Sequence, residues 1–276
     1  LYREIYDKPL VFLDNAASAQ KPNCVIDAVE HAYKMEYANV HRGLHTMANE
    51  TTEAYEAARS KVATFLGAPK AKNIVFTRGA TEALNLVAYG LSGEIKEGDE
   101  IILTEMEHHS NIVPWHFLRE RYGAVLKFAP VNDDGSLDLD AFKSMLSAKT
   151  KIVSVVHMSN VLGTVNPVKG ITKWAKAAGA TMIVDGTQSA IHMDIDVTGI
   201  GCDFFCMTGH KLYGPTGIGA LYGTSEMLRR LQPFNGGGEM IEDVFEDRRQ
   251  RLPSFRHSAF VIDPLEKRPT GRPPLV

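Results

Sequence analysis

The sequence predicts an α/β fold, in which a mostly parallel sheet carries helices on both faces. Short apolar runs with the length of buried strands alternate with longer segments of helical periodicity. Turn residues separate these segments, as at Asp133, Asp134 and Gly135. Strands that are separated by helices pair in parallel, and the helices then cover both faces of the sheet. Right-handed crossovers bring the functional loops to the carboxyl ends of the strands.

The first expected elements are a helix, a strand and a second helix. Asn49 is expected to cap the first helix, and Gly67 to end it. The apolar face of this helix is expected to consist of Ala54, Ala58, Val62 and Phe65. Residues 73–77 then form an apolar strand, and after a glycine turn residues 81–89 show a helical pattern.

The remaining elements continue the alternation. Strands are expected at 101–104, 124–131, 151–157, 181–185, 204–207 and 218–222. Helices are expected at 111–121, 138–146 and 168–178. The chain therefore divides into an N-terminal arm (1–20), a large domain (21–245) and a tail (246–276). The tail is rich in Arg and Pro without a clear period, which predicts irregular structure.

The composition is that of an ordinary soluble globular protein, with 44% hydrophobic and 23% charged residues. A net charge of -3 gives no indication of a nucleic-acid or membrane partner. No apolar run approaches the length of a membrane span, and no signal peptide opens the chain. Cys24, Cys202 and Cys206 are too few for a disulfide framework and suit a reducing compartment. We therefore expect a cytoplasmic protein.

The strongest candidate for a chemical role is Lys211, which lies in the segment 208–217 directly after an apolar strand. The carboxyl end of a strand, followed by a Gly-rich turn, is where an open sheet binds its ligands. An amine at this place can be desolvated, and the lower pKa that results is what Schiff-base chemistry requires. A single lysine in a loop is more often a solvated surface residue, so its neighbours decide the interpretation.

Three other strand ends carry polar groups that suit a cofactor. Asp185 follows an apolar strand, where its carboxylate could pair with a protonated ring nitrogen or simply cap a turn. Gly79 joins a strand to a helix, an arrangement that presents backbone N–H groups to a phosphate. The adjacent residues His108 and His109 point in different directions, so one imidazole could stack on a flat ring or move protons. Together these groups predict a cofactor site at one edge of the sheet.

A metal site is not expected. His41 and His45 are four residues apart, the spacing of a metal-binding pair on a helix. Gly43 lies between them, however, and no third ligand with the spacing of a zinc site is evident.

Seven short segments form a series that extends in order over roughly residues 8–245. They are 13–17, 39–45, 78–82, 107–115, 159–164, 184–188 and 208–217. This series resembles the SUF-type cysteine desulfurases, which belong to the class-V aminotransferase group of fold-type I enzymes that use pyridoxal 5′-phosphate (PLP). The most specific parts are Glu-His-His-Ser-Asn at 107–111 and Thr-Gly-His-Lys-Leu-Tyr-Gly-Pro at 208–215.

The resemblance implies a role for each matched position. Lys211 would bond to PLP, Asp185 would hold the pyridine nitrogen, and His109 would stack on the ring. The ring oxygen and the phosphate would be bound by Asn160, Gln188, Thr81, Thr208 and His210. Ala80 stands where many relatives have a second threonine, which removes one phosphate contact. His41 and Arg42 would lie near the active site, at the interface of a homodimer.

In this family the nucleophilic cysteine lies in a C-terminal region after the PLP domain, followed by a substrate-binding arginine. No residue of this sequence matches either of them. Only residues 255–260 weakly resemble the segment whose threonine would reach the partner's phosphate. We therefore expect that the C-terminal small domain is missing, that the tail is replaced or frame-shifted sequence, and that turnover is impaired or absent.

The implied reaction converts L-cysteine to L-alanine and leaves a persulfide on the enzyme, from which a sulfur-acceptor protein takes sulfur for iron–sulfur cluster assembly. Two enzyme alternatives stay open, a selenocysteine lyase and an epimerase of the same group. A third alternative is a non-catalytic fragment that binds a partner subunit or a sulfur-carrier protein. The site motifs do not separate these possibilities sharply.

Overall fold

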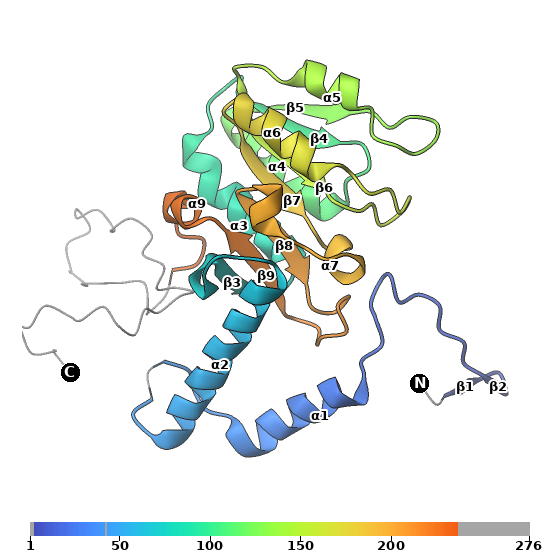
Figure 1. Cartoon of the computed structure of the whole chain (residues 1–276), viewed down its shortest axis with the longest axis vertical. Coiled ribbons are helices and arrows are strands. Elements are labelled where there is room, and N and C mark those ends of the chain that lie inside the picture. The colour runs from blue at the N-terminus through green and yellow to red at the C-terminus, as the bar shows by residue number, and fades with distance from the viewer. Residues whose placement is uncertain (1–2, 42, 237–276) are drawn as a thin grey trace, which may run out of the picture.

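The computed structural model describes residues 3–41 and 43–236, and within this part of the chain it forms a seven-stranded sheet (Figure 1). The strand order is β3-β9-β8-β7-β6-β4-β5. The strands are β3 (Ile74–Thr77), β4 (Glu100–Thr104), β5 (Val125–Ala129), β6 (Thr150–Val156), β7 (Thr181–Asp185), β8 (Phe204–Thr208) and β9 (Gly219–Gly223). Strands β4 to β8 pair in parallel, whereas β9 is antiparallel to both β8 and β3. The predicted mostly parallel sheet is confirmed.

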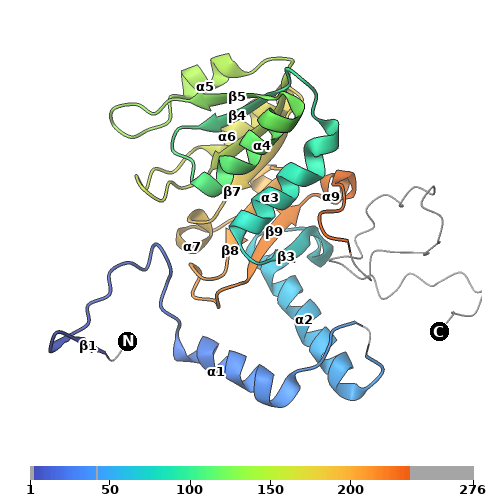
Figure 2. The ribbon, with the colours of Figure 1, turned by 180° about the vertical axis from the view of Figure 1, so that it is seen from behind.

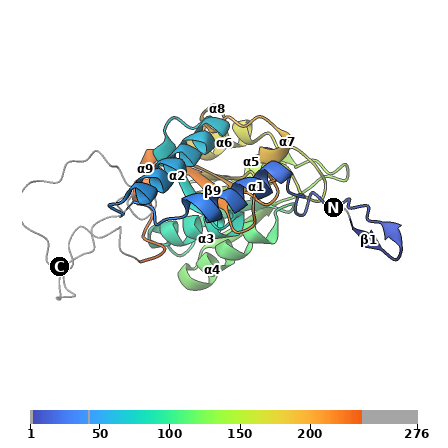
Figure 3. The ribbon, with the colours of Figure 1, turned by 90° about the horizontal axis from the view of Figure 1, so that it is seen from below.

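Helices lie on both faces of this sheet, as Figure 3 shows. The longer ones are α1 (Asn23–His31), α2 (Thr46–Phe65), α3 (Ala80–Leu91), α4 (Val113–Tyr122), α5 (Leu139–Met145) and α6 (Val168–Ala177). Short helices follow at α7 (Ser189–His192), α8 (Val197–Ile200) and α9 (Ser225–Arg230), and a small hairpin, β1 (Glu4–Ile5) and β2 (Lys8–Pro9), precedes them all. Helices α3 and α4 cover one face, and α5, α6 and α8 cover the other.

Two hydrophobic clusters explain why both faces are covered. Neighbouring residues of a strand point to opposite faces, so Ile102 packs in the cluster beneath α6 while Ile101 and Leu103 pack beneath α3 and α4. Trp115 of α4 and Phe142 of α5 are fully buried, one in each cluster. Because both faces of the central strands are buried, those strands appear in the sequence as continuous apolar runs.

Helix α2 differs from its prediction in its start and in its buried face. It begins at Thr46 because the Nδ1 atom of His45 accepts a hydrogen bond from the backbone N of Ala48 (3.3 Å), so Asn49 lies inside the helix and is not its cap. The expected apolar face is largely exposed, and the buried residues are instead Ala48, Arg59 and Ala63. The reason is tertiary: α2 leads away from the sheet towards α1 (Figures 1 and 2), and only its carboxyl end meets the core.

Arg59 attaches α2 to the edge of the sheet. Its side chain is 1% exposed and donates from Nη1 to the backbone oxygen of Ile74 (2.7 Å) and from Nε to Glu56 Oε2 (3.0 Å). The guanidinium also lies over the rings of Tyr55 and Phe76, at 5.0 and 5.1 Å from their centroids. The backbone oxygen, the carboxylate and the two rings together compensate the buried positive charge of Arg59. These contacts fix the carboxyl half of α2 against β3.

The sheet has a topological switch point between β4 and β6. From β4 the chain first crosses to β5 on one side, and later returns to β6 on the other. Strands β4 and β6 pair up to Ile102 and Val153, and beyond this pair the two strands separate towards their carboxyl ends. A crevice at the carboxyl ends of the strands beside such a point is the usual ligand site of an open α/β sheet.

No helix in residues 3–41 or 43–236 is both long enough and apolar enough to cross a membrane. The expected tail (246–276) and the end of the expected large domain lie outside the described residues. The division into an arm, a large domain and a tail therefore stays a prediction.

Candidate active site

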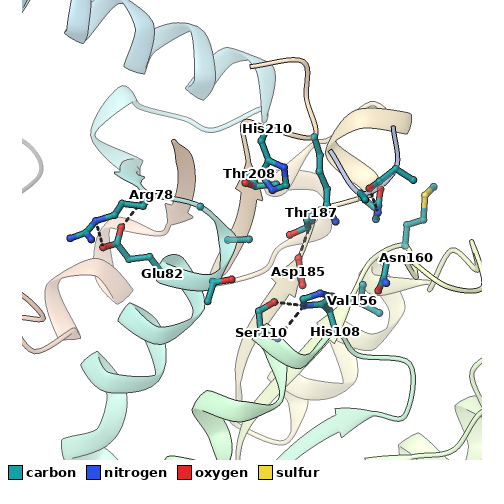
Figure 4. Close-up of a pocket in the computed structure, with 18 of the residues that line it drawn as sticks. Arg78, Glu82, His108, Ser110, Val156, Asn160, Asp185, Thr187, Thr208 and His210 are labelled. Carbon is teal, nitrogen blue, oxygen red and sulfur yellow. Dashed lines mark hydrogen bonds and ion pairs between the residues drawn. The ribbon is translucent and has the colours of Figure 1, made fainter. Parts of the chain in front are cut away.

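A cavity of about 850 Å³ opens at the carboxyl ends of β6, β7 and β8, beside the first turn of α3 (Figure 4). Its lining residues come from the strand ends, the turn before α3 and the N-terminal segment. They are Asp14, Ala16, Ala17, Arg78, Gly79, Ala80, Thr81, Glu82, Asn85, His108, Ser110, Val156, Met158, Asn160, Asp185, Thr187, Gln188, Thr208, His210, Lys211 and Phe234. Eight residues that the sequence predicted for the site thus meet in one cavity: Ala80, Thr81, Asn160, Asp185, Gln188, Thr208, His210 and Lys211.

The Lys211 amine occupies a partly buried position directly after β8. Burial lowers the pKa of Lys211 below the usual value of 10.5, and the negative charge of Asp185 opposes part of that change. A lower pKa increases the fraction of neutral amine near pH 7, and the neutral amine is the nucleophilic form. The position therefore suits a lysine that bonds to a carbonyl carbon.

Asp185, which is 1% exposed, ends β7 at the bottom of the cavity. Its Oδ1 atom accepts a hydrogen bond from the backbone N of Thr187 (2.9 Å), and the Cys206 thiol approaches the same oxygen at 3.6 Å. The Thr187 hydroxyl oxygen is buried and has no hydrogen-bond partner in the described part of the chain. A buried carboxylate and an unpartnered hydroxyl at a cavity wall are groups that a polar ligand can satisfy.

The first turn of α3 forms the end of the cavity that suits an anion. Gly79, Ala80 and Thr81 line the cavity there, together with Thr208 and His210. The first backbone N–H groups of a helix have no partner within the helix and carry its positive dipole end, which favours a phosphate.

A close approach of two backbones allows this turn to form. A Cβ atom added to Gly219 of β9 would lie 2.6 Å from the Cα atom of Gly79, closer than nonbonded carbons can approach. Glycine at position 219 therefore lets the turn before α3 cross β9 directly beside Thr208.

The N-terminal segment closes one side of the cavity. The Gln188 side chain donates from Nε2 to the backbone oxygen of Ala16 (3.1 Å). Lys21 Nζ donates to the backbone oxygen of His210 (2.9 Å), and the His210 ring nitrogen Nδ1 lies 3.1 Å from Ser18 Oγ. Burial, and then the positive charges of Lys211 and Lys21, lower the pKa of His210, which favours the neutral imidazole at neutral pH.

The structure corrects the prediction for the imidazole. Figure 4 shows His108 at the cavity wall, and His109 does not line this cavity in the described part of the chain. His108 precedes the short 3-10 helix His109–Asn111, and its Nδ1 atom accepts from the backbone N of Ser110 (3.1 Å). This turn directs the two consecutive side chains to different sides, so the candidate for stacking on a ring is His108 and not His109.

His41 also lies away from this cavity. Its backbone N donates to Thr52 Oγ1 (2.8 Å), and its ring makes an edge contact with the Tyr55 ring at 5.6 Å on helix α2. Arg42 lies outside the described residues. The predicted role of these two residues at a dimer interface stays a prediction, and no group of His, Cys, Asp or Glu in the described ranges is arranged to hold a metal ion.

The three cysteines occupy two kinds of environment. Cys24 is exposed on α1, whereas Cys202 and Cys206 are buried beside and within β8. Burial raises the pKa of Cys202 to about 12 and that of Cys206 well above its usual value of 9.0. The two buried thiols are therefore small core residues.

The sequence pattern of the family described as "Aminotransferase class-V" matches residues 11–258. The chain belongs to this family. A probable cysteine desulfurase of Synechocystis sp. is 53% identical over 248 residues, which cover 90% of this chain and 59% of that protein.

Two solved structures are similar to this class-V aminotransferase chain. One is the apo structure of a cysteine desulfurase from Thermococcus onnurineus NA1, with a TM-score of 0.83, 41% identity, and coverage of 89% of this chain and 61% of the other. The second is SspA in complex with cysteine, with a TM-score of 0.75, 31% identity, and coverage of 81% and 64%. The chain thus spans less than two thirds of the length of these relatives.

Three features in and beside the cavity were not found from the sequence. They are the buried Thr187 hydroxyl, the contact of Gln188 with the backbone of Ala16, and the buried carboxyl group of Glu107 next to the cavity. Thr187 lies within the segment 184–188 that was singled out, and Glu107 within 107–111, but nothing in either segment indicated a special role for these side chains.

Proposed function

We propose that this chain carries the PLP-binding part of a cysteine desulfurase. The reaction is L-cysteine plus a thiol R–SH giving L-alanine plus a persulfide R–S–SH, in which the carbon–sulfur bond breaks and the sulfur passes to the acceptor thiol. The observation that carries this proposal is the meeting of the Lys211 amine, of lowered pKa, with the buried Asp185 carboxylate in one cavity. The similarity to proteins named cysteine desulfurases supports the choice of substrate.

The residues of the cavity fit PLP in three respects. The helix terminus at Gly79 and Thr81 suits a phosphate, and Asp185 suits the protonated ring nitrogen. The buried, unpartnered Thr187 hydroxyl offers a hydrogen bond to a polar ligand. The volume of about 850 Å³ has room for the cofactor together with a small amino acid.

Each side chain has a separate part in this proposal. Thr81, Thr208 and His210 bind the phosphate, while Asn160 and Gln188 donate to the ring oxygen. Asp185 would keep the ring nitrogen protonated, and His108 would stack on the ring. Ala80 contributes its backbone at a position where a hydroxyl would add one more contact. When bound, PLP supplies an aldehyde that bonds to amines and a ring that takes up electrons from the adjacent carbon.

Lys211 has two tasks in the proposed reaction. Its neutral amine would hold PLP through the aldehyde that the cofactor supplies. With substrate bound, the Nζ atom would take the proton from the substrate Cα atom, a role for which a lowered pKa is suited. Asp185 nearby stabilises the positive charge that forms on Nζ when the proton is taken.

We propose that the acceptor thiol is none of the three cysteines of this chain. Cys202 and Cys206 are buried with raised pKa values, and Cys24 is on α1 and does not line the cavity. Turnover then depends on a thiol supplied to the cavity from another source. Further parts of the proposal, all taken from the resemblance, are homodimer formation, a sulfur-acceptor protein that serves iron–sulfur cluster assembly, and a cytoplasmic location.

Exchange of the Cα proton tests this proposal without an acceptor thiol. The chain is incubated in heavy water with PLP and either L-cysteine or L-alanine, and deuterium at Cα is followed by proton NMR. We expect exchange with both amino acids, and none with Lys211→Ala, since the base is then absent. Addition of dithiothreitol should convert L-cysteine to L-alanine if an external thiol can enter. A chain that binds PLP but exchanges neither proton would contradict the proposed function, and exchange of L-selenocysteine alone would favour the lyase alternative.

A further inference from the structure

A buried carboxyl group lies at the switch point of the sheet, just outside the cavity. Glu107 follows β4, and its side chain fills the space where β4 and β6 separate. Its Oε1 atom accepts from the backbone N of Val156 (2.9 Å) and from Thr104 Oγ1 (2.6 Å), and its Oε2 atom accepts from Asn111 Nδ2 (2.6 Å). The carboxyl group thus replaces the missing ladder contacts between the two strands with side-chain hydrogen bonds.

The orientation of the Asn111 amide is fixed from the other side. Its Oδ1 atom accepts from Trp115 Nε1 (3.1 Å) and from Ser154 Oγ (2.6 Å). The Nδ2 group must therefore face Glu107, where only an acceptor can satisfy it. Because Glu107, Asn111 and Ser154 are all buried, each lost hydrogen bond would leave an unsatisfied polar group.

This network encloses the turn that carries His108. Glu107 is the residue before His108, and Asn111 is three residues after it, at the end of the short helix His109–Asn111. Both ends of the turn are thus held to β6, at Val156 through Glu107 and at Ser154 through Asn111. Val156 itself lines the cavity, so the network connects the cavity wall with the backbone that positions the imidazole.

We propose that Glu107 is a positioning residue, whose buried carboxyl group holds the His108 turn against β6 and so sets the place of the imidazole in the ligand cavity. The inference deepens the proposed function, because the ligand that it concerns is PLP. Glu107 itself does not line the cavity within the described residues, so its effect on a ligand passes through His108 and Val156.

The protonation state of the Glu107 carboxyl group is consistent with this structural role. Burial raises the pKa of Glu107 to about 8, against three hydrogen-bond donors that lower it, and Asp185 adds a small further rise. Val156 N and Asn111 Nδ2 are donors only, so a protonated carboxyl group can donate only towards Thr104, whose hydroxyl can also accept. The network therefore stays complete in either protonation state.

Reversal of one hydrogen bond tests the proposal. The variants are compared at about pH 9, above the Glu107 pKa of about 8, where the carboxylate can only accept hydrogen bonds. Glu107→Gln then places an amide N–H₂ against a donor, and Asn111→Asp places a carboxylate oxygen against an acceptor. In the double variant, the new amide at position 107 donates to the new carboxylate at position 111 while the contacts to Trp115 and Ser154 remain, so the pair is restored with its direction reversed. Glu105→Gln, an exposed carboxylate two residues away that does not line the cavity, is the matched control.

The readouts are the affinity for PLP, by absorbance titration of the chain, and the visible circular dichroism of the bound cofactor, which reports its asymmetric surroundings. Each single variant should weaken PLP binding about tenfold or more, because a buried polar group loses its partner. The double variant should return to within about threefold of the unmutated chain and recover the dichroism. Glu105→Gln should change neither quantity.

Three results would overturn the inference: single variants that bind PLP as well as the unmutated chain, a double variant no better than the singles, or unchanged dichroism in all of them.

If the single variants do not fold, Thr104→Val carries the test, since it removes one donor and leaves the other two. It should weaken PLP binding about threefold, and an unchanged affinity would contradict the role. If the unmutated chain does not bind PLP through Lys211, the proposed function has failed rather than this inference.

Discussion

Gly219 and Gly79 lie so close together that a Cβ atom on Gly219 would be 2.6 Å from the Cα atom of Gly79 and 2.7 Å from the backbone oxygen of Met207. The antiparallel strand β9 and the turn before α3 are therefore in direct backbone contact. The position of this turn sets the width of the cavity at the end that suits a phosphate. Both contacts involve backbone atoms, which cannot move aside as a flexible side chain does.

Gly219→Ala should consequently lower the free energy of unfolding by about 1–3 kcal/mol and weaken PLP binding, because the turn that carries Thr81 must move. Chemical denaturation and a PLP titration measure the two effects. Gly170→Ala is the control, since a Cβ there meets nothing within 4 Å and alanine should stabilise helix α6 by up to about 1 kcal/mol. Equal stability of the two variants would contradict the close approach.

The cysteines should differ strongly in their reactivity. Cys24 is exposed, whereas burial raises the pKa of Cys202 to about 12 and that of Cys206 well above its usual value of 9.0. Iodoacetamide should therefore alkylate Cys24 alone in the folded chain, because only a thiolate reacts. Peptide mass spectrometry identifies the site, and a denatured sample, in which all three should react, is the control. Rapid alkylation of Cys206 in the folded chain would be incompatible with its burial behind Asp185.

Glu107 should make the stability of the chain depend on pH. The folded chain keeps the Glu107 proton up to about pH 8, while the unfolded chain releases it near pH 4.5. The stabilising contribution is thus complete below about pH 4.5 and is lost as the pH rises to about 8. Compared with Glu107→Gln, which does not titrate, the unmutated chain should lose roughly 3–5 kcal/mol of unfolding free energy across this window.

Urea denaturation at several pH values measures that difference, with Glu105→Gln as a variant that should follow the unmutated chain. A difference between Glu107→Gln and the unmutated chain that stays constant with pH would show that Glu107 does not take up a proton on folding.

Asp185 should control the basicity of Lys211. Burial lowers the pKa of Lys211 and the carboxylate of Asp185 raises it, so Asp185→Asn removes the opposing effect and should lower the pKa further. Reductive methylation with carbon-13 followed by an NMR titration of the Lys211 signal reads the pKa directly. An unchanged or higher pKa in the variant would mean that the two side chains do not interact electrostatically.

The large elements could be predicted because burial leaves a pattern in the sequence. Strand β7 was expected at 181–185 and lies there, since an apolar run buried on both faces contrasts with its polar surroundings. Helix α2 shows the limit of this reasoning. Which of its faces is buried depends on the direction in which it leaves the sheet, and a fully buried arginine on a helix face, such as Arg59, has no hydrophobic pattern that could predict it.

The site was predictable in its composition but not in its fine geometry. Asp185 and Lys211 stand at strand ends, and parallel strands bring their carboxyl ends to one edge, so their meeting follows from the fold class. The choice between His108 and His109 depends on the local turn, in which a hydrogen bond from Ser110 N to His108 Nδ1 orients the His108 ring. Likewise, the partner of Asn111, Ser154, is 43 positions away in the sequence.

The central claim is that Lys211 is the residue that bonds to PLP, and chemical trapping tests it most directly. The chain is mixed with PLP, treated with borohydride to make the lysine–cofactor bond permanent, digested, and mapped by mass spectrometry. The account predicts a single modified site at Lys211, and no modification at the cavity in Lys211→Ala. Modification at another lysine while Lys211 stays free, or no modification at all in a folded chain, would contradict it.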